Sequence, residues 1–337
     1  MDIKKYNSID LCKLIMAFGV IAIHTHPLEN CTSDVANNLL DSVVAMAVPF
    51  FFLSTGFLLA QKLQYPFYND GNAKIIIKYI RRMLKLYLIW EIVYFPWAAI
   101  HFHSLNMTLT ESVLDYLQGI IFVGELYNSW HLWYLLSTIY ALLFFLFEIK
   151  RKRSDLAIII IGCVFLLVSV GITYLVGYYE GEVPEILEIV KVVVANTIRS
   201  GRIFLGFFYI SVGMVLAKKD MDLRVSWLML IAGFAANYLI TDVSLSTFVT
   251  AISAIGLFGV IRSIQFADLK IFPFVRKMST ITYFIHMYVW SVYYILVYRE
   301  KRYGMDSFIV TSIACVLISA GYLLLKDRYK RIKQLRV

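Results

Sequence analysis

Two ionisable residues in the first long apolar segment are spaced so that they could act together. The segment covers residues 8–27 (SIDLCKLIMAFGVIAIHTHP) and carries Lys13 and His24, eleven residues apart. At about 100° per residue, this spacing puts both side chains on one helix face, with about 16 Å of rise between them. A neutral imidazole accepts a proton from a hydroxyl or amine near pH 7, so we predict His24 as a general base and Lys13 as a second catalytic residue. The alternative is that Lys13 reaches the inner headgroups and His24 lies in the outer interface.

Glu91 and His286 are two further ionisable residues within apolar segments, LIWEIVYF and STITYFIHMYVW. An unpaired carboxylate at mid-membrane depth is costly, so Glu91 should be protonated or paired, and Lys13 and His286 are its candidate partners. For Glu91, a structural ion pair and a catalytic role are both open. His286 is either a hydrogen-bonded packing residue or a catalytic one. We include both residues in the predicted catalytic set.

The run YIRRMLK supplies three cations near the start of another apolar segment, Arg81, Arg82 and Lys85. Arg82 and Lys85 are three positions apart and share a helix face. Paired cations at such a place could clamp the phosphates of a nucleotide-bearing donor, so we predict this run as a donor-binding site. Ordinary positive charge on the cytoplasmic side of a membrane protein is the alternative.

The sequence WHLWY, residues 130–134, opens the next apolar segment. Aromatic residues at such a boundary usually form an interface belt. His131 among them could instead line an acceptor site beside His24. We group Trp133 and Arg202 with His131 as the predicted substrate-binding residues.

Composition indicates a membrane protein with many spans. Of the 337 residues, 60% are hydrophobic and 16% are charged, and the mean hydropathy is +0.71, whereas a soluble domain carries about 25% charged residues. The net charge of +9 comes from basic residues in short loops, where membrane orientation explains them, so we predict no nucleic-acid partner. The four cysteines form no CxxC pair, and we predict neither a disulfide framework nor a bound metal.

Ten apolar segments approach the roughly 20 residues that a membrane span needs. They lie near residues 8–27, 36–62, 74–101, 130–149, 155–179, 199–217, 224–241, 244–263, 277–298 and 305–325. Basic and acidic loops alternate between them, so the positive-inside rule puts both termini in the cytoplasm. We therefore predict an all-α membrane bundle of about ten transmembrane helices, forming one domain over residues 1–337 in a bacterial plasma membrane.

This topology separates the candidate residues by depth, and one loop opposes it. Lys13 falls in the inner half of the membrane and His24 near the outer side, so donor cations and base lie far apart. The opposing loop carries Arg299, Lys301 and Arg302, which would lie outside and are offset only in part by nearby carboxylates.

Six motifs, in this order, resemble the acyltransferase 3 family of integral membrane acyltransferases over essentially the whole chain. Lys13 and His24 are similar to the basic residue and histidine of the family's first helix, with Lys in place of the commoner Arg. VPFFFLSTGF (48–57) resembles its Phe-rich Ser-Gly-Phe motif, with Thr55 inserted, and Arg82-Met-Leu-Lys85 resembles its Arg-x-x-Arg run. The other three motifs are HLWYL (131–135), GRIFLGFFYISVGMVLA and STITYFIH.

The resemblance implies transfer of an acyl group, often acetyl, from cytoplasmic acyl-CoA to a sugar, a lipid-linked glycan or a similar acceptor. It implies a catalytic role for His24 and donor binding by the Arg-x-x-Arg positions. Either the pantetheine arm of the donor threads the bundle towards His24, or a protein side chain relays the acyl group. Both routes are open at this point.

A narrower resemblance favours a second hypothesis. AVPFFFLSTGF, HLWYL and IAIHTHPL are similar to the membrane half of vancomycin-resistance serine racemases. In those proteins this half precedes a soluble racemase and is thought to handle serine entry. The alternative function is therefore amino-acid uptake. A fused or separate racemase domain would then be a partner, and an oligomer is a further possibility.

Overall fold

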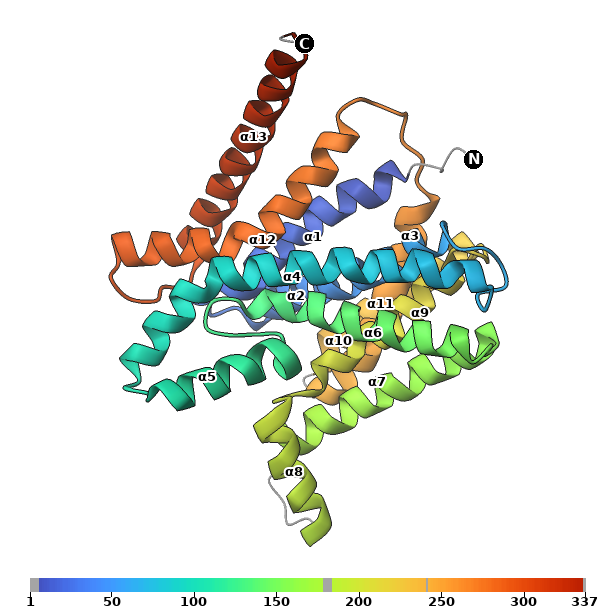
Figure 1. The fold of residues 1–337 in the computed structure, drawn as a ribbon, viewed down its shortest axis with the longest axis horizontal. Coiled ribbons are helices and arrows are strands. Elements are labelled where there is room, and N and C mark those ends of the chain that lie inside the picture. The colour runs from blue at the N-terminus through green and yellow to red at the C-terminus, as the bar shows by residue number, and fades with distance from the viewer. Residues whose placement is uncertain (1–5, 178–183, 241, 336–337) are drawn as a thin grey trace.

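The computed structural model describes residues 6–177, 184–240 and 242–335 of the chain. Helices dominate the fold, and these described residues contain no β-strand (Figure 1). The predicted all-α membrane bundle is therefore confirmed, because so apolar a set of helices needs a bilayer to cover it.

Eight helices in the described part of the chain are long and apolar enough to cross a membrane. One of them is a pair of nearly continuous helices, α2 and α3, which lie within Asp34–Ala60. The spans are α1 (Asn7–Thr25), α2 (Asp34–Val44) with α3 (Ala47–Ala60), α4 (Asp70–Ser104), α6 (Trp133–Lys150), α7 (Asp155–Gly177), α11 (Val243–Ser263), α12 (Phe272–Val297) and α13 (Met305–Leu335).

The two remaining predicted spans, 199–217 and 224–241, are less regular. The first is one arm of a broken pair, in which α8 (Glu185–Thr197) and the segment Gly201–Leu216 meet at 80°. The break follows from its backbone, because Arg199 has a φ of 58° and Ser200 is extended. The second is α10 (Leu223–Leu239), an apolar helix of 17 residues. The described residues thus contain eight candidate spans, or nine if the bent pair counts as one, against about ten predicted.

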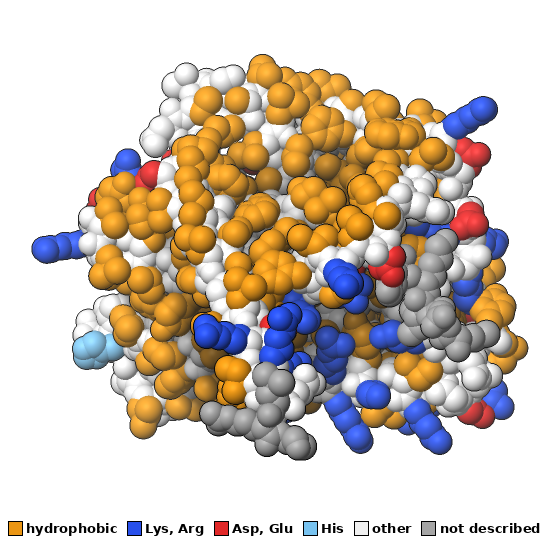
Figure 2. All heavy atoms as spheres, turned by 90° about the horizontal axis from the view of Figure 1, so that it is seen from above, with side chains coloured by type: hydrophobic (Ala, Val, Ile, Leu, Met, Phe, Trp, Pro, Cys, Tyr) orange, Lys and Arg blue, Asp and Glu red, His pale blue; other side chains and the backbone are white. Residues whose placement is uncertain are grey.

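The outer surface of the bundle is apolar where lipid would contact it. On α7, Ile160 and Val164 are 54% and 50% exposed, and on α13 Leu317 and Leu324 are 66% and 64% exposed. Figure 2 shows one face of the molecule with a broad hydrophobic area and Lys and Arg side chains gathered along one side of it. An apolar belt with a basic border is typical of a multi-pass membrane protein.

Glycines let α3 and the second half of the bent segment, α9 (Leu205–Leu216), approach each other closely. A Cβ atom at Gly56 would overlap the backbone carbonyl of Ile210, and one at Gly213 would overlap the carbonyl of Leu53. Small residues at helix crossings are the usual means of tight packing in membranes. The glycines of the STGF and VGM sequences therefore hold these two helices together.

The first helix, α1, is enclosed by the rest of the bundle. It packs against α12, α3 and α13, and Ala17 and Ile21 on it are fully buried. It ends at Thr25 because His26 takes a left-handed conformation, φ 43°, just before Pro27. Enclosure brings both ends of α1 into contact with residues from distant parts of the sequence.

Candidate active site

Three histidines from separate segments meet near the end of α1. The rings of His24 on α1 and His286 on α12 stack with centroids 5.4 Å apart. His131, in the 3₁₀ helix η2 (Trp130–Leu132), meets His286 edge to face at 4.8 Å. His286 is therefore the central ring of a histidine cluster composed of His24, His131 and His286. His131 and His286 are buried, at 2% and 0% exposed.

Three ring nitrogens of the histidine cluster make no hydrogen bond to the described residues. Nδ1 of His286 lies 2.7 Å from the backbone oxygen of Tyr283. A carbonyl oxygen only accepts, so Nδ1 donates, and Nε2 of the neutral ring is left as an acceptor. Nε2 of His286 and both ring nitrogens of His131 have no hydrogen-bond partner among the described residues. Because buried polar atoms are normally paired, these nitrogens are suited to a substrate hydroxyl, an amine or a water molecule.

Tyrosine hydroxyls fix the backbone around the histidine cluster. Tyr283 donates through Oη to the carbonyl of His131 at 2.7 Å, which ties α12 to η2. Tyr94 on α4 donates to the carbonyl of Phe284 at 2.7 Å, and its ring meets His131 edge to face at 5.2 Å. The positions of two histidines thus depend on three elements that are remote in sequence.

A cavity of about 590 Å³ lies towards the start of α1. We call it the donor cavity. Its polar end contains the cations Lys13, Lys62, Arg82 and Arg276 together with Asp10. Its other walls include Tyr134, Tyr283 and Phe284. The ring of Tyr283 lies 5.4 Å from that of His131 and 6.1 Å from that of His286, so the donor cavity extends from a cationic mouth to the edge of the histidine cluster.

An ion pair orders the mouth of the donor cavity. The guanidinium of Arg276 on α12 makes hydrogen bonds of 2.6 to 2.9 Å to both carboxylate oxygens of Asp10 on α1. Asp10 is buried, whereas the Arg276 side chain is 55% exposed. Bidentate pairing fixes the plane of the guanidinium and leaves its remaining N–H groups able to donate. Lys13 also lines the cavity, and it makes no ion pair with any described residue.

The structure divides the three predicted donor-binding cations. All three lie on α4 and are exposed, and of the three only Arg82 lines the donor cavity. The paired clamp of Arg82 and Lys85 stays a prediction.

Glu91 stands apart from the histidine cluster and from Lys13. It is 2% exposed on α4, and no ion pair joins it to Lys13 or His286, so the predicted pairing is not made. The Glu91 side chain faces Tyr87, one helical turn earlier on α4. The Tyr87 hydroxyl donates to the carbonyl of Ile120 at 2.8 Å. Glu91 points elsewhere because Trp90 and Tyr94 lie on the face of α4 that contacts α12 and His131.

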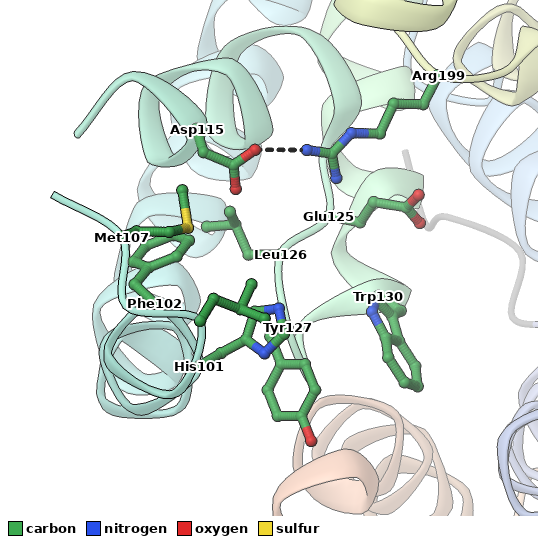
Figure 3. Close-up of a pocket in the computed structure, with 10 residues that line it drawn as sticks. His101, Phe102, Met107, Asp115, Glu125, Leu126, Tyr127, Trp130 and Arg199 are labelled. Carbon is green, nitrogen blue, oxygen red and sulfur yellow. Dashed lines mark hydrogen bonds and ion pairs between the residues drawn. The ribbon is translucent and has the colours of Figure 1, made fainter. Parts of the chain in front are cut away.

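A second cavity, of about 460 Å³, is shown in Figure 3, and the predicted topology puts it towards the outer side. We call it the outer cavity. Tyr127 and His101 stack in it at 4.3 Å, and Arg199 pairs with Asp115 at 2.7 Å. Burial, followed by the neighbouring Tyr294 hydroxyl, raises the pKa of Tyr127 to about 12, so its hydroxyl stays protonated. Trp130 lines the outer cavity, and its ring lies 6.1 Å from that of His24, so it connects the outer cavity to the histidine cluster.

Two of the predicted substrate-binding residues line a third cavity. Trp133 and Arg202 border a space of about 480 Å³ that also contains Thr250 and Tyr209. The Arg202 guanidinium lies 5.7 Å from the Trp133 ring and pairs with Glu125 at 2.7 Å. His131 is not part of this lining, so the predicted trio is split between the histidine cluster and a separate cavity.

The sequence pointed to the motifs but missed several residues within them. Tyr134 and Tyr283 belong to HLWYL and STITYFIH, and Thr55 bonds Tyr134 hydroxyl to hydroxyl at 2.7 Å. Arg276 lies one helical turn before the STITYFIH segment, where it could have been noticed. Nothing local in the sequence links it to Asp10, which lies 266 residues away.

A family model described as an acyltransferase domain, Acyl_transf_3, matches residues 6–325. No solved structure matches the chain significantly. Within the described residues, no group of three or more His, Cys, Asp or Glu side chains is placed to hold a metal ion.

The curated relatives are larger proteins. An amino-acid racemase from Enterococcus faecalis is 29% identical over 48% of this chain and 22% of its own length. A second amino-acid racemase from the same organism is 27% identical over 51% of this chain and 22% of its own length. A serine/alanine racemase from Enterococcus gallinarum is 28% identical over 39% of this chain and 18% of its own length. The matched region is about a fifth of each relative.

Proposed function

Since the chain belongs to the acyltransferase family Acyl_transf_3, we propose that it moves an acyl group, in the simplest case acetyl, from cytoplasmic acyl-CoA to a hydroxyl or amine of a small-molecule or cell-envelope glycan acceptor. The observation that carries the proposal is the donor cavity, which reaches from four cations to rings that touch the histidine cluster. The membrane is proposed to be a bacterial plasma membrane, as the bacterial source of the relatives suggests.

The nucleotide end of the donor would bind at the mouth of the donor cavity. Arg82 and Arg276 would donate hydrogen bonds to phosphate oxygens, and Lys13 would add a positive charge. Asp10 holds Arg276 in place and so acts as a positioning residue. We therefore assign Lys13 to donor binding, because it shares the cavity with the other cations.

The acyl thioester would lie at the inner end of the donor cavity, beside the histidine cluster. The oxygen or nitrogen of the acceptor attacks the thioester carbonyl, and His24 takes the proton from that hydroxyl or amine. The C–S bond breaks, a C–O or C–N bond forms, and the proton passes to the thiolate, which leaves as coenzyme A. His286 stacks on His24, and its Nε2, which has no partner among the described residues, would pass that proton on.

Direct transfer is favoured over a relay on a side chain. The donor cavity is lined by Lys13 and also by Tyr283 and Phe284, whose rings contact His131, so a pantetheine arm would have a path along it. A relay would need a second transfer step as well as a nucleophile on that path, for which the lining offers the hydroxyls of Thr55, Ser279 and Thr280.

The test uses purified protein in lipid, with labelled acyl-CoA binding and acyl transfer or hydrolysis measured together. His24→Gln and His24→Ala should lower the rate of transfer by about 10²–10⁴-fold, because neither side chain can take up a proton. Binding of acyl-CoA should remain, since the cations lie at the other end of α1. Transfer by His24→Gln at the wild-type rate would remove His24 from the mechanism.

A second candidate function is amino-acid uptake. It is favoured by one observation, that the curated relatives are named as amino-acid and serine/alanine racemases. Under this hypothesis His24 would only form hydrogen bonds to the transported amino acid. Uptake of labelled serine into vesicles should then survive in His24→Gln, and acyl-CoA should show no binding.

A further inference from the structure

The loop between α12 and α13 carries positive charge on the side of the membrane where the positive-inside rule predicts few cations. Arg299, Lys301 and Arg302 lie in this loop, which the predicted topology places outside. Positive residues outside oppose the positive-inside rule, so orientation does not explain them. A role in binding is the remaining reason for cations at this place.

The loop is fixed against the end of α1. The backbone N–H of Gly304 donates to the carbonyl of Thr25 at 2.9 Å. The indole of Trp290 and the hydroxyl of Ser307 both donate to the carbonyl of Arg302, at 3.0 and 2.9 Å. Thr25 directly follows His24, so the position of the loop is set relative to the proposed base.

Three aromatic rings hold the ammonium group of Lys301. Its Nζ lies 4.3 Å from the ring centroid of Trp130, 4.8 Å from that of Tyr303 and 5.5 Å from that of Trp290. Cation–π contacts of this kind restrain a side chain that would otherwise move freely. Lys301 is nonetheless exposed, and no carboxylate of the described residues lies within ion-pair distance of it. It is a fixed cation that still lacks an anionic partner.

The same tryptophan connects Lys301 to the reaction. The ring of Trp130 lies 6.1 Å from that of His24 and also lines the outer cavity (Figure 3). The two carboxylates of the outer cavity are already paired, Asp115 with Arg199 and Glu125 with Arg202. They would not repel an anion there, because each negative charge is offset by a guanidinium.

We propose that Lys301 binds an anionic group of the acceptor, a carboxylate or a phosphate, while the acceptor body occupies the outer cavity. This inference rests on the proposed function and adds the charge of the acceptor to it. The restrained ammonium offers its N–H groups to the anion at a small entropic cost, because the three rings already limit its motion. Anchored in this way, the acceptor hydroxyl or amine would lie over Trp130 and face His24.

The experiment measures the melting temperature of the purified protein in detergent, with coenzyme A at saturation to occupy the donor cavity. Sodium phosphate and sodium acetate are each compared with sodium chloride at equal ionic strength. In the wild type, the anion that binds should raise the melting temperature by about 2–4 °C, since a ligand stabilises the state that binds it. Phosphate alone would indicate a phosphorylated acceptor, and an equal effect of acetate would indicate carboxylates as well.

Variants separate this site from general salt effects. Lys301→Gln should lose the anion-dependent shift, Lys301→Arg should keep it, and Arg299→Gln, a neighbouring exposed cation, should keep it as a matched control. Equal shifts in wild type and Lys301→Gln, or no shift in wild type, would overturn the proposal. Coenzyme A by itself should raise the melting temperature in every variant, and its failure to do so would count against the donor assignment and leave the anion result independent.

Discussion

The two ends of α1 differ in how they treat charge. At its start, Asp10 is buried but fully paired with the half-exposed Arg276, and further cations line the donor cavity. Near its end, His24 stacks on His286, and Nε2 of His286 and both ring nitrogens of His131 have no partner among the described residues. One end holds its buried carboxylate in a fixed ion pair with a guanidinium that remains half exposed. The other holds groups that are neutral unless a proton arrives.

This contrast separates binding from proton transfer. A phosphate is recognised by charges that do not change. Ion pairing or contact with water lowers the energetic cost of such charges at a membrane surface. A general base must instead be able to gain and lose charge during the reaction, so its nitrogen cannot be occupied by a permanent partner. Substitutions at the two ends should therefore alter different measured quantities.

The largest effect that sharpens the contrast is expected at His286. His286→Asn keeps a donor for the Tyr283 carbonyl in place of Nδ1 but loses Nε2, so acyl transfer should fall by about 10²-fold. His286→Gln should be compared with it, because a longer amide places a polar group nearer the position of Nε2. The melting temperature of both and their affinity for acyl-CoA should stay close to wild type. A normal rate in His286→Asn would make this histidine a packing residue.

A smaller effect is expected at the mouth of the donor cavity, where a substitution of Arg82 can be compared with one of Lys85 as its control. Arg82→Gln should weaken acyl-CoA binding about tenfold, or about 1.4 kcal/mol, because it removes a donor to phosphate. Lys85→Gln should change the affinity by less than about twofold, since Lys85 is outside the lining. The measurement is equilibrium binding of labelled acyl-CoA at several ionic strengths, where the difference should shrink as salt screens the exposed charge. Equal losses in both variants would support the paired clamp.

The smallest effect is expected at Glu91, which belongs to neither end. Glutamine has the shape of a protonated glutamate, so Glu91→Gln should change the melting temperature by less than about 2 °C if no ion pair is lost. Breaking a buried ion pair would instead cost about 3–5 kcal/mol. Thermal unfolding in detergent distinguishes these outcomes. A large loss of stability, partly restored by a second change at Lys13 or His286, would show that one of them pairs with Glu91 in the membrane.

The sequence by itself determined the class of fold and the positions of the motifs. Apolar runs of about 20 residues have few alternatives to membrane helices, and every predicted span corresponds to an apolar helix of the structure. The motif glycines, such as Gly56, follow the same logic, because only a missing side chain permits the contact that Gly56 makes with Ile210. Periodicity and composition are local properties, so they could be predicted locally.

Only the tertiary structure decided which motif residues meet. The pairing of Asp10 with Arg276 joins positions 266 residues apart, and Tyr283 reaches His131 across 152 residues. It also leaves Glu91 without an ion pair to Lys13 or His286, and it leaves Lys85 outside the lining of the donor cavity. The physical reason is that a helix fixes the direction of each side chain relative to its own axis, whereas the rotation of that axis against its neighbours is set by packing. The composition of a site between helices therefore depends on contacts that no single segment encodes.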